Sequence, residues 1–508
     1  MRESENARRC ASNVRRHCPA CWAALALVSG RGFCHTTVLF RADTNPTPSL
    51  LHVRTARSAT QTLAQFIVDI RFDQLPAVVV QAAKIAILDG FATMLAGSTQ
   101  ELATIIGAYV QEMGGTPQAS VIGWGFKTNP VSAAFANGVF GHCLDYEIQG
   151  FPPTHGTSAC LPAALALGEA HRVPGTTIIE AYVVGWDIQG RLRAASVAAA
   201  NPGFHPPGMV GPLGGAAASA KVLGLDTHQT QMALGIAASR TGGLTANTGT
   251  MVKATHPGNA ARMGVEAAIL AGKGYTAHEA ALEAPRGYAE ALFQGQVDWD
   301  VATGHLGHPY RLVAPGYDIK RFPAQVYMQN PIEAVLNLRQ KYHLEANMVE
   351  ELIIHRQGRG HAGPLPRSGL DGKFSVEYCA AAALLDGQVV IDTFTDQRRF
   401  ARDMEETLRK VRVAPVEQEP GVVRVEAKLK DGRTVTDECR GFKGSARNPM
   451  TREEHMVKVW DCVDRALPQA DAAQMIALLE DLEHVPDIAA LMQIVGQKSP
   501  ARSSVSMA

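Results

Sequence analysis

The sequence lacks an excess of charge of either sign. Its 508 residues include 48 lysines and arginines and 48 aspartates and glutamates, so the formal net charge is zero when the histidines are neutral. Proteins that bind nucleic acid or an anionic membrane through their overall field carry a clear positive excess. We therefore expect neither partner, and any anion that this protein binds must be held by local charges.

Long apolar runs and several common functional motifs are also missing. No stretch of 18 uncharged apolar residues occurs, so no segment is expected to span a bilayer. There is no GxxxxGK[ST] loop, no GxSxG turn and, beyond the first 57 residues, no three-cysteine pattern for an iron–sulfur cluster. Nine irregularly spaced cysteines indicate a reducing compartment rather than a disulfide framework. What remains is His, Asp and Lys chemistry on a small anion, with neither cofactor nor metal expected.

Residues 1–57 differ in composition from the rest of the chain. They contain nine arginines, no lysine and only three acidic residues. An arginine-rich, acid-poor leader is typical of a mitochondrial transit peptide, and a signal-like segment or a misassigned start is the alternative. We therefore predict the mitochondrial matrix if this leader is a transit peptide, and the cytoplasm otherwise. The pair Cys18 and Cys21 is too little on its own to predict a zinc site.

Apolar periodicity predicts a helical region over about 60–300. In the first long helix, Val78, Ile85, Leu88, Ala92 and Leu95 recur at helical spacing and should share one face. Further alanine-rich segments are separated by loops rich in Gly, Pro, Asn and Thr. These predicted helices lie near 129–141, 159–171, 176–199, 209–224, 227–238 and 258–273.

Short β-branched runs appear after about residue 310. The run Val422–Leu429 turns at Asp431-Gly432 into Thr434–Glu438, which predicts a β-hairpin. Further strands are expected at Glu351–His355 and Lys410–Val413, and helices near 330–342, 374–386, 395–409, 452–466, 470–482 and 486–495. The fold is therefore predicted to be mostly α with a smaller α+β domain. We place a leader at 1–57, a helical domain at 58–315, an α+β lid at 316–443, helices returning to the first domain at 444–497 and a disordered tail at 498–508.

Three polar clusters interrupt the helical region. The first runs from His142 through Asp145 to His155, the second surrounds His205, and the third contains Lys253 and His256. We read each as a Gly- or Pro-rich loop, the last two directly before a helix, where free N–H groups favour a bound carboxylate. The alternative without a function is that Asp145 caps a helix, that the histidines are loop residues with ordinary hydrogen-bond partners and that Lys253 is solvated.

A fourth candidate is the segment 319–324, which carries Lys320 and Arg321 at the proposed domain junction. Ligand clefts commonly lie between domains, so we take both residues, together with His256, as candidates for substrate binding. A lone Lys-Arg pair is, however, more often an ordinary surface feature.

Taken together, these motifs resemble the MmgE/PrpD family, which contains 2-methylcitrate dehydratases and cis-aconitate decarboxylases. The resemblance covers about 60–495. It is carried by Ile87–Gly90, Asn137–Tyr146, Pro153–His155, Phe204–Pro207, Lys253–Arg262 and Ile319–Pro323. It implies a helical domain built from both chain ends, a smaller α+β lid, a homodimer and no cofactor.

The resemblance also implies a set of site residues. Asp145, His155, His205, Lys253 and Lys320 match positions that line the decarboxylase active site. In the mechanism that follows, the two lysines would hold substrate carboxylates and stabilise the enolate-like charge. His155 or His205 would deliver the proton, and Asp145 would orient an imidazole.

Two departures from the family pattern bear on the reaction. Glu147, Ile148 and Gln149 stand where the family usually has Asp, Asp and Thr or Ser, and Gln325 and Gln329 stand in a segment where many members place His. Gln cannot transfer a proton near neutral pH, so another donor or another substrate is needed.

The sequence therefore predicts a cofactor-independent lyase acting on a di- or tricarboxylate. Our first expectation is decarboxylation of cis-aconitate to itaconate, and dehydration of 2-methylcitrate or a longer alkylcitrate is the alternative. A non-catalytic dimeric metabolite-binding relative and an epimerase or isomerase on the same fold also remain open.

Overall fold

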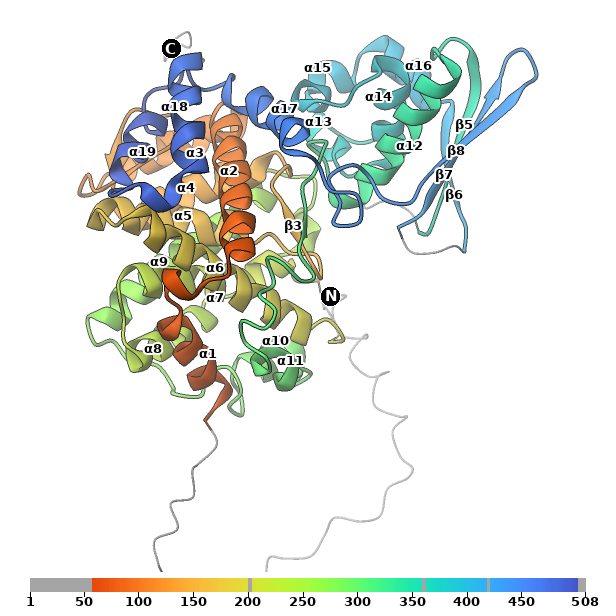
Figure 1. Ribbon diagram of the computed structural model, residues 1–508. Coiled ribbons are helices and arrows are strands. Elements are labelled where there is room, and N and C mark those ends of the chain that lie inside the picture. The colour runs from red at the N-terminus through yellow and green to blue at the C-terminus, as the bar shows by residue number, and fades with distance from the viewer. Residues whose placement is uncertain (1–56, 200–202, 359–361, 418–420, 501–508) are drawn as a thin grey trace, which may run out of the picture. The chain divides into compact units, whose positions relative to one another are not determined.

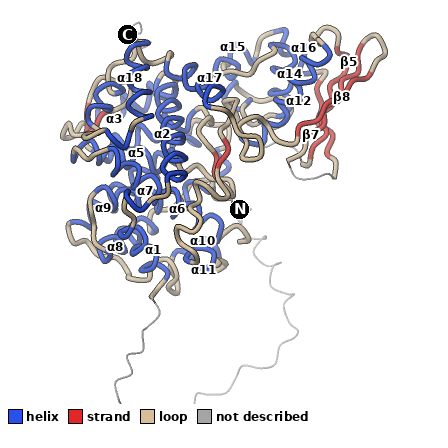
Figure 2. The backbone as a smooth tube through the Cα atoms, viewed as in Figure 1, coloured by secondary structure: helices blue, strands red, loops and turns tan. Residues whose placement is uncertain are grey.

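A computed structural model describes residues 57–199, 203–358, 362–417 and 421–500. The predictions for the leader, including the Cys18–Cys21 pair, and for most of the tail therefore lie outside the described residues. The described residues form one compact unit. Within it the chain is mainly helical, and the larger sheet is confined to the segment 349–439 (Figure 2). The predicted fold class is confirmed.

The first helices of the chain gather around one hydrophobic core (Figure 1). They are rich in Ala and Gly, and the central ones, α4, α5 and α7, are buried along nearly their whole length. Such all-round burial is expected of a helix inside a large core. The helices are α1 Ala59–Asp69, α2 Ala77–Ser98, α3 Glu101–Met113, α4 Pro130–Cys143, α5 Thr157–His171, α6 Gly175–Ala195, α7 Pro206–Val222, α8 Thr227–Ala238, α9 Val252–Gly272, α10 Tyr288–Phe293 and α11 Trp299–Thr303.

Glycines allow α4, α7 and α9 to approach each other closely. A Cβ added at Gly264 of α9 would lie 2.3 Å from the carbonyl carbon of Gly215 in α7, and one at Gly138 of α4 would lie 2.8 Å from the Cα of Gly258. Small residues at such crossings let two helix backbones touch. The close approach brings together the ends of these three helices, which carry most of the candidate site.

We expect Gly264→Ala to lower the free energy of unfolding by about 1–3 kcal/mol, because the added methyl group must push α9 away from α7. Urea unfolding followed by circular dichroism measures the change. Gly272→Ala on the same helix is the control, since its Cβ would meet only a Leu225 methyl group, at 3.2 Å. Equal stability of the two variants would contradict the proposed close packing.

Helix α2 belongs to the core, although by length and composition alone it could cross a membrane. It is the one such helix among the described residues, and 67% of its most apolar stretch is buried. Its residue Asp89 is fully buried and pairs with Lys458 at 2.6 Å. Of the five residues predicted to share one face of this helix, Leu88, Ala92 and Leu95 are buried, Ile85 is half-buried, and Val78 in the first turn is 58% exposed.

The later part of the chain forms a mixed sheet in the order β6-β5-β7-β8. The strands are β5 Val349–Arg356, β6 Val411–Pro415, β7 Val423–Leu429 and β8 Thr434–Cys439. β5 and β6 are parallel, and β7 and β8 form the predicted hairpin, with Gly432 at φ +90° in its turn. The associated helices are α12 Val326–Tyr342, α13 Gly369–Gly372, α14 Val376–Asp386, α15 Asp396–Arg399 and α16 Arg402–Leu408.

Two hydrophobic cores meet at the segment 319–322. The second core, from Phe322 to Phe442, contains the sheet and its helices. The last helices return to the first core, as Figure 1 shows for α17 Arg452–Val463, α18 Gln469–Glu480 and α19 Ala489–Val495. This is the two-domain architecture that the resemblance implied, while the exact domain boundaries drawn from the sequence stay a prediction.

A two-residue strand pair links the two parts of the candidate site. Strand β3, Gln149–Gly150, follows the loop after α4 and pairs antiparallel with β4, Tyr317–Asp318. The next residue, Ile319, donates its N–H to the carbonyl of Gly444 at 2.7 Å. Because β3 and β4 are held side by side, Lys320 lies next to the Asp145 loop.

Candidate active site

The structure brings six of the seven predicted site residues into one buried cluster. His205 directly precedes α7, His155 lies two residues before α5, and Asp145 lies two residues after α4. Lys253 and His256 lie in the first turns of α9. The prediction that these two precede a helix near 258 was wrong, since α9 begins at Val252 and accommodates Pro257 within its second turn.

Asp145 is the charged centre of this cluster. Its carboxylate accepts a hydrogen bond from Lys253 Nζ at 2.7 Å and pairs through its other oxygen with Lys320 Nζ. Lys320 also donates a hydrogen bond to the backbone carbonyl of Asp145 at 2.9 Å. The backbone of Asp145 is left-handed, with a φ of 51°. Burial alone would raise the pKa of Asp145, but the two ammonium groups hold that pKa well below its usual range. The alternatives of a helix cap and a solvated Lys253 are therefore wrong.

Glu147 joins two histidines beside this ion pair. His142 Nδ1 lies 2.5 Å and His155 Nδ1 2.9 Å from the same Glu147 oxygen. His142 Nε2 accepts a hydrogen bond from Lys253 Nζ at 2.8 Å, so His142 carries its proton on Nδ1. Burial lowers the pKa of His142 to about 4 despite the Glu147 carboxylate, so the ring is neutral at pH 7. Glu147, which the sequence marked only as a departure, thus orients two imidazoles.

A second pair of histidines completes the cluster. His205 Nδ1 lies 3.0 Å from His256 Nδ1, and the His205 ring centre lies 6.1 Å from that of His142 and 6.2 Å from that of His155. Burial, with the charge of Lys253, holds the pKa of His205 well below its usual range. Burial likewise lowers the pKa of His256 to about 4. In the free protein these imidazoles are therefore neutral, and a bound anion is needed to charge one of them.

A small pocket opens onto the cluster between the start of α9 and the lid. Lys253, Asp145 and His142 face it from one side, and Lys373 and Phe374 face it from the lid. Leu102, Cys143, Thr250, Met251, Ala254 and Leu370 complete its lining. The first turn of α9 has no side-chain cap, so its N-terminal end adds a positive dipole to the lysines.

Arg321 is the candidate that the structure does not bring into the cluster. Its guanidinium pairs with Glu333 of α12 at 2.7 Å, and its side chain is 44% exposed. The buried amide of Gln329 instead binds the N–H and carbonyl of Phe322, at 3.0 and 2.9 Å, and so shapes the turn after Lys320. Gln325 caps the start of α12 without a side-chain bond to that helix.

His142, Glu147 and His155 are also the buried group, among the described residues, whose atoms are close enough to hold a metal ion. These atoms already contact one another, and Lys253 is bonded to the far nitrogen of His142. A divalent cation would have to break the contact between His142 and Glu147, and it would lie close to the positively charged Lys253. We therefore assign no metal. The expected absence of a metal and of a cofactor stays a prediction.

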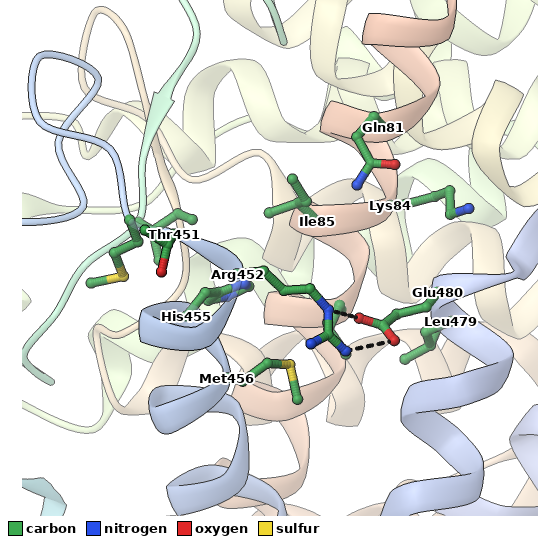
Figure 3. Close-up of a pocket in the computed structure, with 12 residues that line it drawn as sticks. Gln81, Lys84, Ile85, Thr451, Arg452, His455, Met456, Leu479 and Glu480 are labelled. Atoms are coloured by element: carbon green, nitrogen blue, oxygen red, sulfur yellow. Dashed lines mark hydrogen bonds and ion pairs between the residues drawn. The ribbon is translucent and has the colours of Figure 1, made fainter.

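A larger pocket, of about 330 Å³, lies between α2, α17 and α18 (Figure 3). Figure 3 shows Arg452 and Glu480 joined across its wall, and Lys84 is paired with Glu483 at 2.6 Å. The remaining lining is largely apolar, with Ile85 and Leu479 among its residues. Its charged side chains are already in ion pairs, Lys84 with Glu483 and Arg452 with Glu480, and its His455 is bonded to Asp89. We therefore take the histidine cluster, and not this pocket, as the candidate site.

Comparisons with known proteins show the family of this chain. Residues 61–300 match the MmgE/PrpD N-terminal domain and residues 322–484 the C-terminal domain. The chain is 30% identical over 464 residues to the cis-aconitate decarboxylase of Homo sapiens, covering 87% of this chain and 96% of that protein. Identity to the enzyme of the same name is 29% for Mus musculus, over 86% of this chain and 93% of that protein. For Aspergillus terreus it is 28%, over 84% of this chain and 94% of that protein. The chain belongs to the MmgE/PrpD family.

Proposed function

We propose that this protein is a cofactor-independent lyase that decarboxylates a cis-aconitate-like tricarboxylate. The observation that carries the proposal is the Asp145 carboxylate held between Lys253 and Lys320, next to a cluster of histidines that His142 and His155 join to His205 and His256. Relatives at 28–30% identity over most of the chain that bear the name cis-aconitate decarboxylase support it.

The two lysines are suited to hold substrate carboxylates. Lys253 and Lys320 share one carboxylate, that of Asp145, so the trio retains a net positive charge in a buried setting. A cation attracts a carboxylate more strongly where water is excluded than at the protein surface. A substrate carboxylate that contacts either ammonium group would neutralise this charge.

In the proposed reaction, the bond between a substrate carbon and one carboxylate breaks and CO₂ leaves. The electron pair remains on the substrate and spreads towards a neighbouring carboxylate, where a lysine ammonium stabilises the developing charge. A proton from an imidazole forms the new C–H bond, and the imidazole takes a proton back from water. Atoms and charge balance without an oxidant or a cofactor.

His155 and His205 are the proposed proton donors, as the sequence predicted. Burial lowers the pKa of both rings, so neither is charged in the free protein. A bound tricarboxylate adds negative charge nearby and favours the protonated imidazole. The substrate would thus generate the acid that its own reaction needs, and Glu147 would hold the ring of His155 in place.

Dehydration of 2-methylcitrate or another alkylcitrate is the second candidate. The observation in its favour is that burial holds the histidines neutral, and a neutral imidazole is the form that removes a proton next to a carboxylate. The same lysines would hold the carboxylates, and a second imidazole would protonate the departing hydroxyl.

Product masses distinguish these reactions. We expect the full chain, incubated with cis-aconitate, to yield a product lighter by one CO₂, and 2-methylcitrate and citrate to be unchanged. A product lighter by one water from either hydroxy acid would replace decarboxylation by dehydration. Binding, seen as a thermal shift, without turnover of any of the three would support the non-catalytic alternative. Homodimer formation and the mitochondrial location stay predictions, which size-exclusion chromatography and fractionation would test.

A further inference from the structure

Lys373 is a buried lysine that the sequence did not single out. It directly follows α13 on the lid side, and only 3% of the residue is exposed. Its Nζ donates to the carbonyl of Leu144 at 3.1 Å and to that of Pro323 at 2.9 Å. It therefore touches the residue before Asp145 and the turn after Lys320, the two segments that carry the charged centre.

Lys373 differs from the other lysines of this region in its partners. Lys253 and Lys320 pair with Asp145, and Lys458 pairs with Asp89. Among the residues that the structure describes, Lys373 forms no ion pair; its partners are two neutral carbonyls and the ring of Phe394, whose centre lies 4.4 Å from Nζ. An ammonium group has three donors, and two carbonyls leave one unused.

A buried ammonium without a counter-charge is costly, so its retention calls for an explanation. Burial, only partly offset by Asp145 and by the Cys143 thiol, lowers the pKa of Lys373 to about 8. Lys221 is a useful comparison, since it also donates to two carbonyls and burial also lowers its pKa to about 8. Lys221 fixes the end of α1, whereas Lys373 lines the pocket with His142 and Lys253.

We propose that Lys373 binds a substrate carboxylate directly, in the pocket that it lines together with Lys253 and Asp145, so that a tricarboxylate gains a cation that a dicarboxylate cannot use. Lys253 and Lys320 already share one aspartate, whereas Lys373 forms no ion pair with any residue of the described chain. The pocket then selects a tricarboxylate over a dicarboxylate of similar length. This inference rests on the proposed function and specifies its substrate class.

The test measures binding rather than turnover. Propane-1,2,3-tricarboxylate has neither a double bond nor a hydroxyl group to react, and glutarate lacks its central carboxylate. Titration calorimetry on the full chain should give a Kd at least about tenfold lower for the tricarboxylate, a difference worth about 1.4 kcal/mol. In Lys373→Met we expect this ratio to fall to about threefold or less. Lys221→Met, the matched control, should keep the ratio of the parent. An unchanged ratio in Lys373→Met would overturn the proposal.

A second measurement needs no variant and so does not depend on how Lys373→Met folds. Lys373 is charged below its pKa of about 8 and loses its charge as the pH rises through that value. The carboxylates of both ligands stay ionised between about pH 7 and about pH 9.5. The Kd ratio of the parent should therefore shrink over this interval, and a constant ratio would contradict direct binding by Lys373.

These outcomes separate the inference from the proposed function. If cis-aconitate is turned over but the Kd ratio does not respond to Lys373→Met or to pH, only the role of Lys373 is lost. If the ratio responds but cis-aconitate and the hydroxy acids are not turned over, the tricarboxylate site stands and the lyase activity is lost.

Discussion

Lys253→Met should lower kcat/KM for the proposed decarboxylation by about 10³-fold or more while leaving the protein folded. The ammonium group contacts both Asp145 and His142, so its loss removes a cation from the substrate and the hydrogen bond that fixes an imidazole. Removing one group that stabilises developing charge typically costs about 10²–10³-fold in rate. Methionine keeps most of the apolar stem of the side chain but loses the cation–π contact with Phe374, whose ring centre lies 5.3 Å from Nζ.

Steady-state kinetics and thermal unfolding of the same preparations measure this effect. Lys221→Met is the control, because it also removes a buried ammonium that donates to two carbonyls, but at the end of α1. We expect this control to keep its activity within about threefold of the parent. Turnover by Lys253→Met within about tenfold of the parent would remove Lys253 from the mechanism.

Asp89→Ala should lower the free energy of unfolding by about 3–5 kcal/mol, the largest stability effect that we expect from a single residue. Asp89 is fully buried in α2 and binds Lys458 at 2.6 Å and His455 at 3.1 Å from α17. Without it the Lys458 ammonium stays buried and keeps only the Tyr146 carbonyl, at 2.7 Å, as a hydrogen-bond acceptor. Asp481→Ala, an exposed pair with His484, should change stability by less than about 0.5 kcal/mol.

The same pair predicts a pH dependence with a definite sign. Burial would raise the pKa of Asp89, but Lys458 and His455 more than offset it and lower that pKa from its usual 3.8. A lowered pKa means that the stability contributed by ionised Asp89 is fully present above pH 3.8 and is lost as the pH falls through the folded-state pKa. Urea unfolding should therefore show a smaller loss of stability below pH 3.8 in Asp89→Ala than in the parent. Parallel pH profiles would contradict a paired, ionised Asp89.

Local sequence patterns predicted much of the fold. The Asp431-Gly432 turn and its β-branched flanks fixed the hairpin, because the turn needs a residue at positive φ and Gly432 supplies it. Periodicity located the helices but misplaced some starts. The starts predicted near 209 and 258 come too late, because α7 begins at Pro206 and α9 at Val252. Pro207 lies in the first turn of α7, where the missing N–H costs little, whereas Pro257 lies inside α9.

The site was only partly predictable, because some of its residues contact each other although they lie far apart in the sequence. The motif at 142–155 and the Lys253 motif could be recognised in the sequence because they are polar residues in apolar surroundings. The family resemblance then assigned them roles. Lys373 had no such signal, because its importance arises from contact with Leu144, which lies 229 residues away. Glu147 was misread for a similar reason, since its two imidazole partners become visible only when α4 and the following loop fold together.

The most direct test of the central claim, that an imidazole of this cluster delivers a proton to a substrate carbon after CO₂ has left, is to run the reaction in D₂O and locate the deuterium by NMR. We expect each product molecule to carry one carbon-bound deuterium in a single stereochemical configuration, because a fixed side chain reaches one face of the bound intermediate. Product with deuterium in both configurations equally would show protonation in free solution and would contradict the proposed site.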